Sequence, residues 1–312
     1  MALYIFLSCF TLICTHPFIN MNKIFKNILT YSFILLLSIP AFAGTSDSLR
    51  IKPSFIVDTP LLHTLDSLVF ASLNERHKEN IFPEDRNYNY APDFIPKFHD
   101  SIYEQRLAAL NRLTPIELTF NKEVKSQIEL YANKKRNLTA RMLGLAKLYF
   151  PLFEEQLDKY DMPLEFKYLA IVESALNPTA GSHKGAKGLW QFMYGTGKVY
   201  DLKVSSMVDD RYDPYKSTVA ACEHLTDLYN IYGDWSLALA AYNSGAGNVN
   251  RALRRAGGTK NYWAIWPFLP RETRGYVPAF IAVNYVMNYA PEHNIQVVEP
   301  PYYYYNTDTV TV

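Results

Sequence analysis

The stretch from Asp161 to Pro178 has the sequence DMPLEFKYLAIVESALNP, and its apolar residues recur at helical spacing. Asp161 is a favourable helix cap, and Pro163 suits a first turn, where its missing N–H is not needed. The pattern predicts one helix that runs from this cap to the Asn177-Pro178 stop. Glu173 falls in the last turn of that helix, directly after the apolar run LAIV.

Glu173 is in a position where an ordinary surface carboxylate is not expected. The negative end of the helix dipole and partial burial both disfavour its ionised form, so its pKa is predicted to be raised. A raised pKa suits a general acid at neutral pH. On this segment alone, a solvated glutamate at a helix end explains the residue equally well.

The flanking sequence predicts a mainly α fold. From Asn121 onward the periodicity is helical almost throughout, and no convincing alternating strand precedes the tail. Repeated prolines before Pro115 indicate an irregular extension with short helices. The predicted helices are Leu61–Lys78, Ile102–Leu113, Pro214–Tyr232 started by Asp213 and closed by Gly233, Trp235–Asn243 started by Asp234, one opened by Asn248, and Arg271–Tyr289 with Pro278 as a kink or a start.

The N-terminal sequence predicts export. Met21 opens MNKIFK, an apolar run follows, and AFA precedes Gly44, which are the three parts of a secretory signal peptide. An uncleaved membrane anchor is the alternative, although the apolar run is short for a membrane span. The predicted parts are a mis-called start (1–20), a signal peptide (21–43), an N-terminal extension (44–118), the main helical domain (119–290) and an extended tail (291–312).

Composition excludes several classes of protein. The net charge is +1 and no basic stripe is present, which argues against a nucleic-acid partner. The seven histidines include no HxxxH pair, so no metal site is predicted. Removal of residues 1–43 leaves Cys222 and takes away Cys9 and Cys14, so no internal disulfide is expected. Cys222 is expected to be a buried small hydrophobe.

Two glycine-punctuated segments follow the Glu173 helix in sequence. They are AGSHKGAKGLWQFM at 180–193 and AAYNSGAGN at 240–248. Such loops allow backbone to approach a ligand closely, but each segment taken singly fits an ordinary helix end and turn.

Taken together, these segments resemble the lytic murein transglycosylase family, the SLT domain of the lysozyme-like superfamily, and most closely its membrane-bound D type. The resemblance covers about Pro115 to Tyr289, and Tyr131–Phe153 resembles the family's N-terminal helical lead. Its motifs, in the family's order and spacing, are Glu173-Ser174, Gly188–Met193, Ala241–Gly245 and Leu269–Pro278.

The resemblance implies a role for each matching residue. Glu173 becomes the single catalytic acid and base, and Ser174 supports its turn. The residues implied to line the sugar subsites or to lie beside Glu173 are Ser182, Gln191, Met193, Tyr242, Asn243 and Tyr276.

The implied reaction cleaves the bond between N-acetylmuramic acid and N-acetylglucosamine without water and leaves a 1,6-anhydro end. The motifs contain no second carboxylate, which an ordinary glycoside hydrolase needs. A goose-type lysozyme-like hydrolase and a non-catalytic glycan-binding protein are the alternatives, and the intact Glu173 argues against the latter.

The resemblance also sets expectations for location and partners. Peptidoglycan glycan strands are the expected partner, no cofactor is expected, and the expected location is the periplasm, with envelope association and oligomeric state left open. Unlike many D-type relatives, the sequence shows no LysM repeats after residue 290 and no lipidated cysteine after residue 43.

Overall fold

The computed structural model describes residue 86 and residues 88–301. In that part of the chain all regular elements are helices, and extended pairing is limited to three isolated β-bridges. The prediction of a mainly α fold is therefore confirmed. The signal peptide, the helix predicted at 61–78 and the tail after residue 301 lie outside the described residues.

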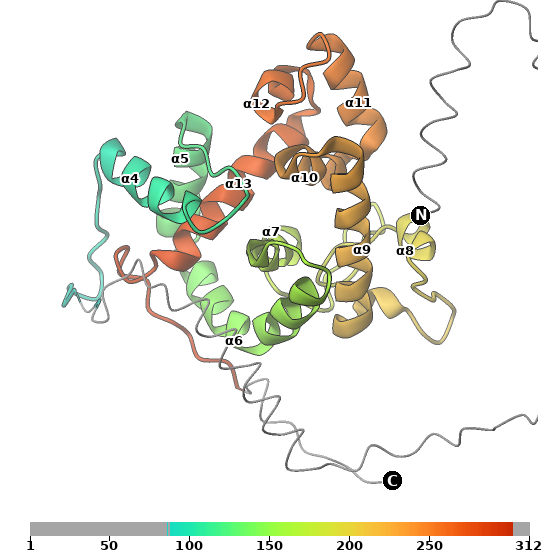
Figure 1. Ribbon diagram of the computed structural model, residues 1–312. Helices are drawn as coiled ribbons and strands as arrows, with labels where there is room; N and C mark the ends of the chain where they lie inside the picture. The colour runs from blue at the N-terminus through green and yellow to red at the C-terminus, as the bar shows by residue number, and fades with distance from the viewer. Residues whose placement is uncertain (1–85, 87, 302–312) are drawn as a thin grey trace, which may run out of the picture. The chain divides into compact units, whose positions relative to one another are not determined.

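Figure 1 shows α7 (Leu169–Ser174), the short helix that contains Glu173, at the centre of the described helices, with α6, α9, α10 and α13 around it. In chain order the elements are α4 (Asp100–Asn111), α5 (Lys122–Glu129), the π-helical η1 (Leu130–Lys134), α6 (Arg136–Lys159), the 3₁₀-helical η2 (Leu164–Tyr168), α7 (Leu169–Ser174), α8 (Tyr194–Val199), η3 (Asp210–Tyr212), α9 (Pro214–Tyr232), α10 (Trp235–Ser244), α11 (Ala246–Arg255), α12 (Tyr262–Ile265), η4 (Trp266–Phe268) and α13 (Arg271–Asn288).

The central position of α7 follows from its apolar sequence. Leu169 and Ala170 are completely buried, and Ile171 is 2% exposed. Just before them, the ring of Phe166 lies 4.8 Å from that of Trp235 and 5.9 Å from that of Phe280. A helix that is apolar on every side is stable only inside a core. Glu173, in the last turn of α7, therefore lies directly beside the core.

The capping residues predicted for α9 and α10 are confirmed. The Asp213 side chain accepts a hydrogen bond from the backbone N–H of Lys216 at 2.9 Å, and Gly233 ends α9 with φ 66°. Asp234 caps α10 in the same way, at 2.7 Å from the nitrogen of Leu237. Both helices start and stop through local chemistry, which is why the sequence located them.

Pro278 lies inside α13 and does not start the helix. A proline has no N–H, so the carbonyl of Arg274 loses its normal helical donor. Two aromatic side chains replace that donor: Trp266 Nε1 at 2.9 Å and the Tyr262 hydroxyl at 3.0 Å. The proline is tolerated because these side chains satisfy the freed carbonyl.

The start predicted for the Glu173 helix was wrong. Asp161 has φ 52° and does not cap, and the run begins after Pro163 as the 3₁₀ turn η2. The end also comes earlier than the Asn177-Pro178 stop. Ala175 and Leu176 adopt left-handed φ values of 52° and 60°, and their N–H groups bond back to Ile171 and Ala170. This is a helix-ending motif that needs no proline.

The helix predicted to open at Asn248 begins earlier, at Ala246. Gly245 ends α10 through its N–H bond to Ala241 at 2.7 Å, and its φ of 83° also allows it to start α11. Asn248 instead donates its side-chain amide to the carbonyl of Ser244 at 2.8 Å. One glycine thus replaces the predicted polar cap.

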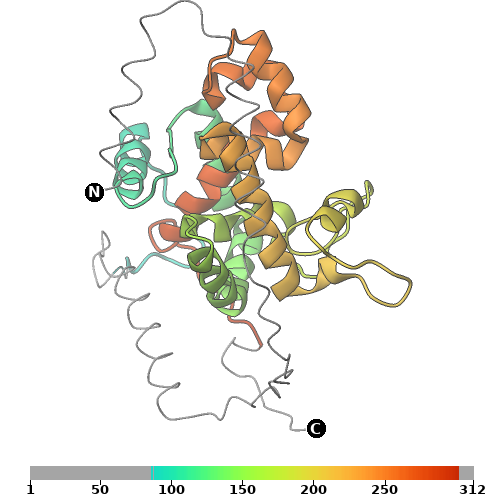
Figure 2. The same ribbon diagram turned by 45° about the vertical axis from the view of Figure 1, so that its right-hand side comes forward.

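The described part of the tail, residues 295–301, has no regular secondary structure and packs against α6. The N–H of Val298 bonds to the carbonyl of Ala140 at 3.0 Å, and Ile295 is 4% exposed. A Cβ on Gly144 would lie 1.8 Å from the Val298 oxygen, so the close approach requires glycine. In Figure 2 the yellow segment around α8 and the loop that follows it project away from the other helices.

Candidate active site

Glu173 opens into a cavity of about 330 Å³ at the C-terminal end of α7. Three separate segments form its walls: the lead formed by η1 and the start of α6, the end of α7, and the loop between α7 and α8. The lining residues are Tyr131, Lys135, Leu138, Met142, Ile171, Val172, Glu173, Ser174, Ala175, Ala180, Gly181, Ser182 and Gln191. The cavity therefore combines the predicted lead with the first two motifs.

Glu173 is half-buried, and among the described residues no lysine or arginine forms an ion pair with it. Burial raises the pKa of its carboxyl, the hydrogen bond from Tyr276 lowers it, and the charge of Glu272 raises it further. The resulting pKa is about 7. The side chain is partly exposed because it faces the cavity, but protein surrounds the carboxyl closely enough for desolvation to dominate. The group can therefore give and take a proton near neutral pH.

Two tyrosines lie beside the carboxylate. The hydroxyl of Tyr276, which comes from α13 and is 7% exposed, donates a hydrogen bond to Glu173 Oε1. The hydroxyl of Tyr242, from α10, donates to the carbonyl of Trp190 at 2.8 Å. Burial raises the pKa of Tyr242, and the nearby charge of Glu173 raises it further. Both hydroxyls stay protonated at neutral pH, so they serve as hydrogen-bonding groups rather than bases.

Ser174 connects the end of α7 to the following loop. Its hydroxyl lies 2.9 Å from the carbonyl of Ala170 and 2.9 Å from that of Leu189. In the described part of the chain no histidine or lysine contacts it. The supporting role of Ser174 in the Glu173 turn stays a prediction.

The loop from Ala180 to Gln191 is shaped by glycine and by backbone hydrogen bonds. Gly188 has φ 79°, and a Cβ there would meet the Arg211 carbonyl oxygen at 1.8 Å. Gln191 has a left-handed φ of 49°, and its side-chain amide donates to the carbonyl of Gly188 at 2.9 Å. Ser182 accepts the N–H of Ala186 at 3.0 Å. Ser182 and Gln191 thus have internal partners and also line the cavity.

Four predicted site residues do not line this cavity. Tyr242 and Tyr276 lie beside Glu173 behind the cavity wall, and Met193 and Asn243 have other surroundings. Met193 is 44% exposed and precedes α8, and the side-chain oxygen of Asn243 accepts a hydrogen bond from the Thr273 hydroxyl at 2.9 Å. Asn243 therefore connects α10 to α13. The roles proposed for Met193 and Asn243 stay predictions.

Sequence reasoning missed the wall formed by Tyr131, Lys135, Leu138 and Met142. Lys135 Nζ lies 5.5 Å from the centre of the Tyr131 ring. The only signal in the sequence is an aromatic residue and a cation four residues apart, a spacing common on any helix. Only the folded arrangement brings this pair to Glu173.

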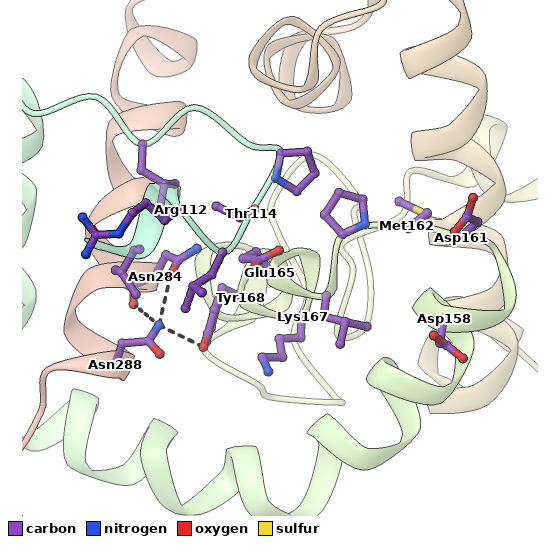
Figure 3. Close-up of a pocket in the computed structure, with 16 residues that line it drawn as sticks. Arg112, Thr114, Asp158, Asp161, Met162, Glu165, Lys167, Tyr168, Asn284 and Asn288 are labelled. Atoms are coloured by element: carbon purple, nitrogen blue, oxygen red, sulfur yellow. Dashed lines mark hydrogen bonds between the residues drawn. The ribbon is translucent and has the colours of Figure 1, made fainter. Parts of the chain in front are cut away.

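A larger cavity, of about 470 Å³, lies at the other end of the η2–α7 run (Figure 3). Asn288 there donates to the Tyr168 hydroxyl at 3.2 Å and to the Asn284 side chain at 3.1 Å. Lys167, which lines the same cavity, forms an ion pair with Glu154 at 2.5 Å. The buried charge of Lys167 is thus already neutralised by Glu154. The larger cavity therefore offers no unpaired buried charge, and cavity size alone does not identify the active site.

Other predicted features can be compared with the described residues. Cys222 is completely buried in α9, which confirms the expectation of a buried small side chain, and burial raises the pKa of its thiol to about 12. Within residues 86 and 88–301, no cluster of three or more histidine, cysteine or acidic side chains could hold a metal ion, and no helix has the length and apolar character needed to cross a membrane.

Comparison with known proteins gives a family match over this region. Residues 151–265 match the family model of the transglycosylase SLT domain. The chain is 35% identical over 180 residues to membrane-bound lytic murein transglycosylase D of Escherichia coli strain K12, which covers 56% of this chain and 39% of that protein. It is 30% identical over 148 residues to the soluble lytic murein transglycosylase of the same strain, covering 45% and 23%.

Among solved structures, the 70 kDa soluble lytic transglycosylase of Escherichia coli aligns with a TM-score of 0.42 and 20% identity, over 74% of this chain and 44% of that one. The chain thus spans well under half the length of these relatives. The family match includes Glu173, the following loop and Tyr242, whereas Tyr276 and the lead at Tyr131 lie outside it.

Proposed function

Because residues 151–265 carry a transglycosylase SLT domain, we propose that the chain is a lytic transglycosylase that cleaves the glycan strands of peptidoglycan. The observation that carries the proposal is a half-buried Glu173 with no basic partner among the described residues and a pKa of about 7. Such a carboxyl can act as an acid and then as a base within one turnover.

In the proposed reaction Glu173 acts twice. It first protonates the oxygen between C1 of N-acetylmuramic acid and the next N-acetylglucosamine, and the C1–O bond breaks. The ionised Glu173 then takes the proton from the C6 hydroxyl of the same muramic sugar as that oxygen bonds to C1. The products are a 1,6-anhydro end and a free N-acetylglucosamine end, and Glu173 is protonated again.

The composition of the cavity favours this route over hydrolysis. Glycoside hydrolases normally place a second carboxylate about 5–10 Å from the acid. Glu173 is the only acidic residue that lines the described cavity. Glu272 is exposed and lies 3.5 Å from Lys184 in an ion pair. An internal hydroxyl is also favoured by proximity, equivalent to roughly 10⁵–10⁸ M of an external nucleophile.

We assign the neighbouring residues to holding the acid and the sugar. Tyr276 fixes the Glu173 carboxyl, and Ser182 and Gln191 present polar groups along the cavity wall. Tyr242 uses its hydrogen on Trp190, which leaves its oxygen free to accept a sugar hydroxyl. In this proposal Met193 and Asn243 contact the strand at the margin of the site.

Product analysis in labelled water tests the reaction type. Purified sacculi would be digested in ¹⁸O-water, and the soluble fragments would be analysed by mass spectrometry. We expect unlabelled fragments that are one water lighter than hydrolytic fragments. Reducing ends that carry the label would instead identify a goose-type hydrolase. Binding to sacculi without any released fragment would identify a glycan-binding protein.

We also propose that the protein is exported to the periplasm, because its substrate lies outside the cytoplasm and its N-terminal sequence has the pattern of a signal peptide. Sequencing of the mature N-terminus should find Gly44. An intact Met21 in a membrane fraction would identify an uncleaved anchor.

A further inference from the structure

A second cavity, of about 370 Å³, lies between α5, η4 and the first turns of α13. Figure 1 shows α5 beside α13, with α12 nearby. Gln127 and Gly275 line this cavity, and each is close to the candidate active site along its own helix. Tyr131, one turn after Gln127, lines the Glu173 cavity, and Tyr276, next to Gly275, contacts Glu173. The two cavities are therefore neighbours along the same pair of helices.

The second cavity has a basic lining. Lys122, Arg271 and Arg274 line it against a single acidic residue, Glu123. Arg274 is fixed, because its guanidinium donates to the carbonyl of Leu269 at 2.9 Å and to that of Pro267 at 2.8 Å. Lys122 and Arg271 are exposed, and neither takes part in the ion pairs or side-chain hydrogen bonds of the described residues. Their charges are free for a ligand.

The same cavity offers flat apolar surface next to these charges. Trp266 and Pro278 line it, and the Arg274 guanidinium lies 5.5 Å from the Trp266 ring centre. Trp266 is held in place by its own hydrogen bond to the Arg274 carbonyl at 2.9 Å. A fixed ring beside unpaired cations suits a ligand that joins carboxylates to short aliphatic or amide groups. A glycan strand without its peptides has only the lactyl carboxylate on each muramic ring, which stays beside the sugar and would leave the two cations unused.

We infer that this cavity binds the carboxylates of the peptide that branches from the glycan strand, while the sugar occupies the Glu173 cavity. The inference rests on the proposed function, since it names a second part of the same substrate. Lys122 lies nine residues before Tyr131, and Arg271 lies five residues before Tyr276, which is about 14 Å and about 8 Å along the helices. Four extended peptide residues span roughly 13–14 Å, so a branch of this length reaches both cations. The cavity would then make the enzyme prefer peptide-bearing strands over stripped ones.

The test compares two forms of one substrate. Glycan strands that carry their peptides, and the same strands stripped by an amidase, would be digested by the wild type and by the double variant Lys122→Gln/Arg271→Gln. On peptide-bearing strands we expect KM to rise roughly tenfold with kcat unchanged, because two charge contacts are lost. On stripped strands the two proteins should have equal KM values. Added salt should raise the wild-type KM more on the peptide-bearing form than on the stripped form, which keeps only its lactyl carboxylates.

The matched control is Arg254→Gln/Arg255→Gln, which removes the same charge from two exposed residues of α11 that do not line this cavity. It should leave both KM values unchanged. An equal loss in the control, or an equal rise on stripped strands, would overturn the inference and indicate a general charge effect.

A binding arm keeps this result separate from the proposed function. In a Glu173→Gln background, cosedimentation with peptide-bearing and stripped sacculi measures affinity without cleavage. We expect the added Lys122→Gln/Arg271→Gln changes to weaken binding to peptide-bearing sacculi and to leave binding to stripped sacculi unchanged. If the wild type cleaves neither substrate, the proposed function fails. The difference in binding between peptide-bearing and stripped sacculi would still decide whether the cavity binds peptide carboxylates.

Discussion

Two ionisable residues, the buried Lys167 and the half-buried Glu173, lie six positions apart on the same central helical run, and each lines a cavity. Burial lowers the pKa of Lys167, but the charges of Tyr168 and Glu154 raise it more, so its pKa lies above the ordinary value. Glu173 has no such counter-charge, and burial raises its pKa to about 7. Lys167 in the larger cavity is neutralised by Glu154, whereas Glu173 in the smaller cavity can exchange its proton near neutral pH.

The difference shows what separates a structural charge from a reactive one. In a buried ion pair each charge compensates the other, and removing one partner leaves an uncompensated charge. A buried carboxyl without a cation is costly in its ionised form, and this cost is what brings its pKa close to the working pH. The predictions below test this contrast.

The largest effect is expected from Glu173→Gln. Glutamine keeps the shape and can still accept the Tyr276 hydrogen bond, but it cannot transfer a proton. We expect cleavage of sacculi to fall on the order of 10²–10⁴-fold with no loss of folding, measured by release of soluble fragments. Glu272→Gln, a nearby exposed control, should keep most of the activity. Near-normal clearing of sacculi by Glu173→Gln would mean that another residue is the acid.

Lys167→Met should affect stability and not chemistry. Removal of the lysine leaves Glu154 partly buried without its partner, so we expect the free energy of unfolding to fall by about 2–3 kcal/mol. Urea denaturation would measure the loss, and kcat of the folded enzyme should not change. Lys159→Met, which breaks the exposed Lys159–Glu155 pair, should change stability by less than about 0.5 kcal/mol. Equal losses of unfolding free energy in Lys167→Met and Lys159→Met would show that the buried pair stabilises the fold no more than the exposed pair does.

The unpaired Glu173 should also make stability depend on pH. Its pKa rises from an ordinary 4.5 to about 7 on folding, so the folded state holds the extra proton between these values. The contribution is complete below pH 4.5 and is lost as pH rises through 7. We expect Glu173→Gln to match the wild type at pH 4.5 and to be about 1–3 kcal/mol more stable at pH 8. Parallel stability curves across this range would contradict a raised pKa.

Tyr276→Phe should give the smallest effect. Its hydrogen bond lowers the pKa of Glu173, so removing it should raise that pKa and move the alkaline limb of the rate profile to higher pH. The plateau rate should fall roughly threefold to tenfold, the worth of one hydrogen bond. Tyr242→Phe is the control, because its hydroxyl bonds to Trp190 and not to Glu173. An unmoved limb in Tyr276→Phe would show that the hydrogen bond does not set the pKa.

The sequence by itself determined the features that depend on neighbouring residues. Helical periodicity gave the mainly α fold, the caps Asp213 and Asp234 gave the starts of α9 and α10, and the apolar run placed Glu173 at a buried helix end. Two helix ends were predicted wrongly because backbone conformation, and not a side-chain cap or a proline, sets them. Gly245 starts α11 in place of Asn248, and the left-handed Ala175 ends α7 before Asn177-Pro178.

Only the tertiary structure decided what surrounds the carboxyl. Tyr276 reaches Glu173 across 103 residues of sequence, and the Tyr131 wall comes from the opposite direction along the chain. The pKa of a buried group depends on all nearby charges and on the water that the surrounding elements exclude. No local pattern contains that sum, so the sequence could single out Glu173 but not the cavity that raises its pKa.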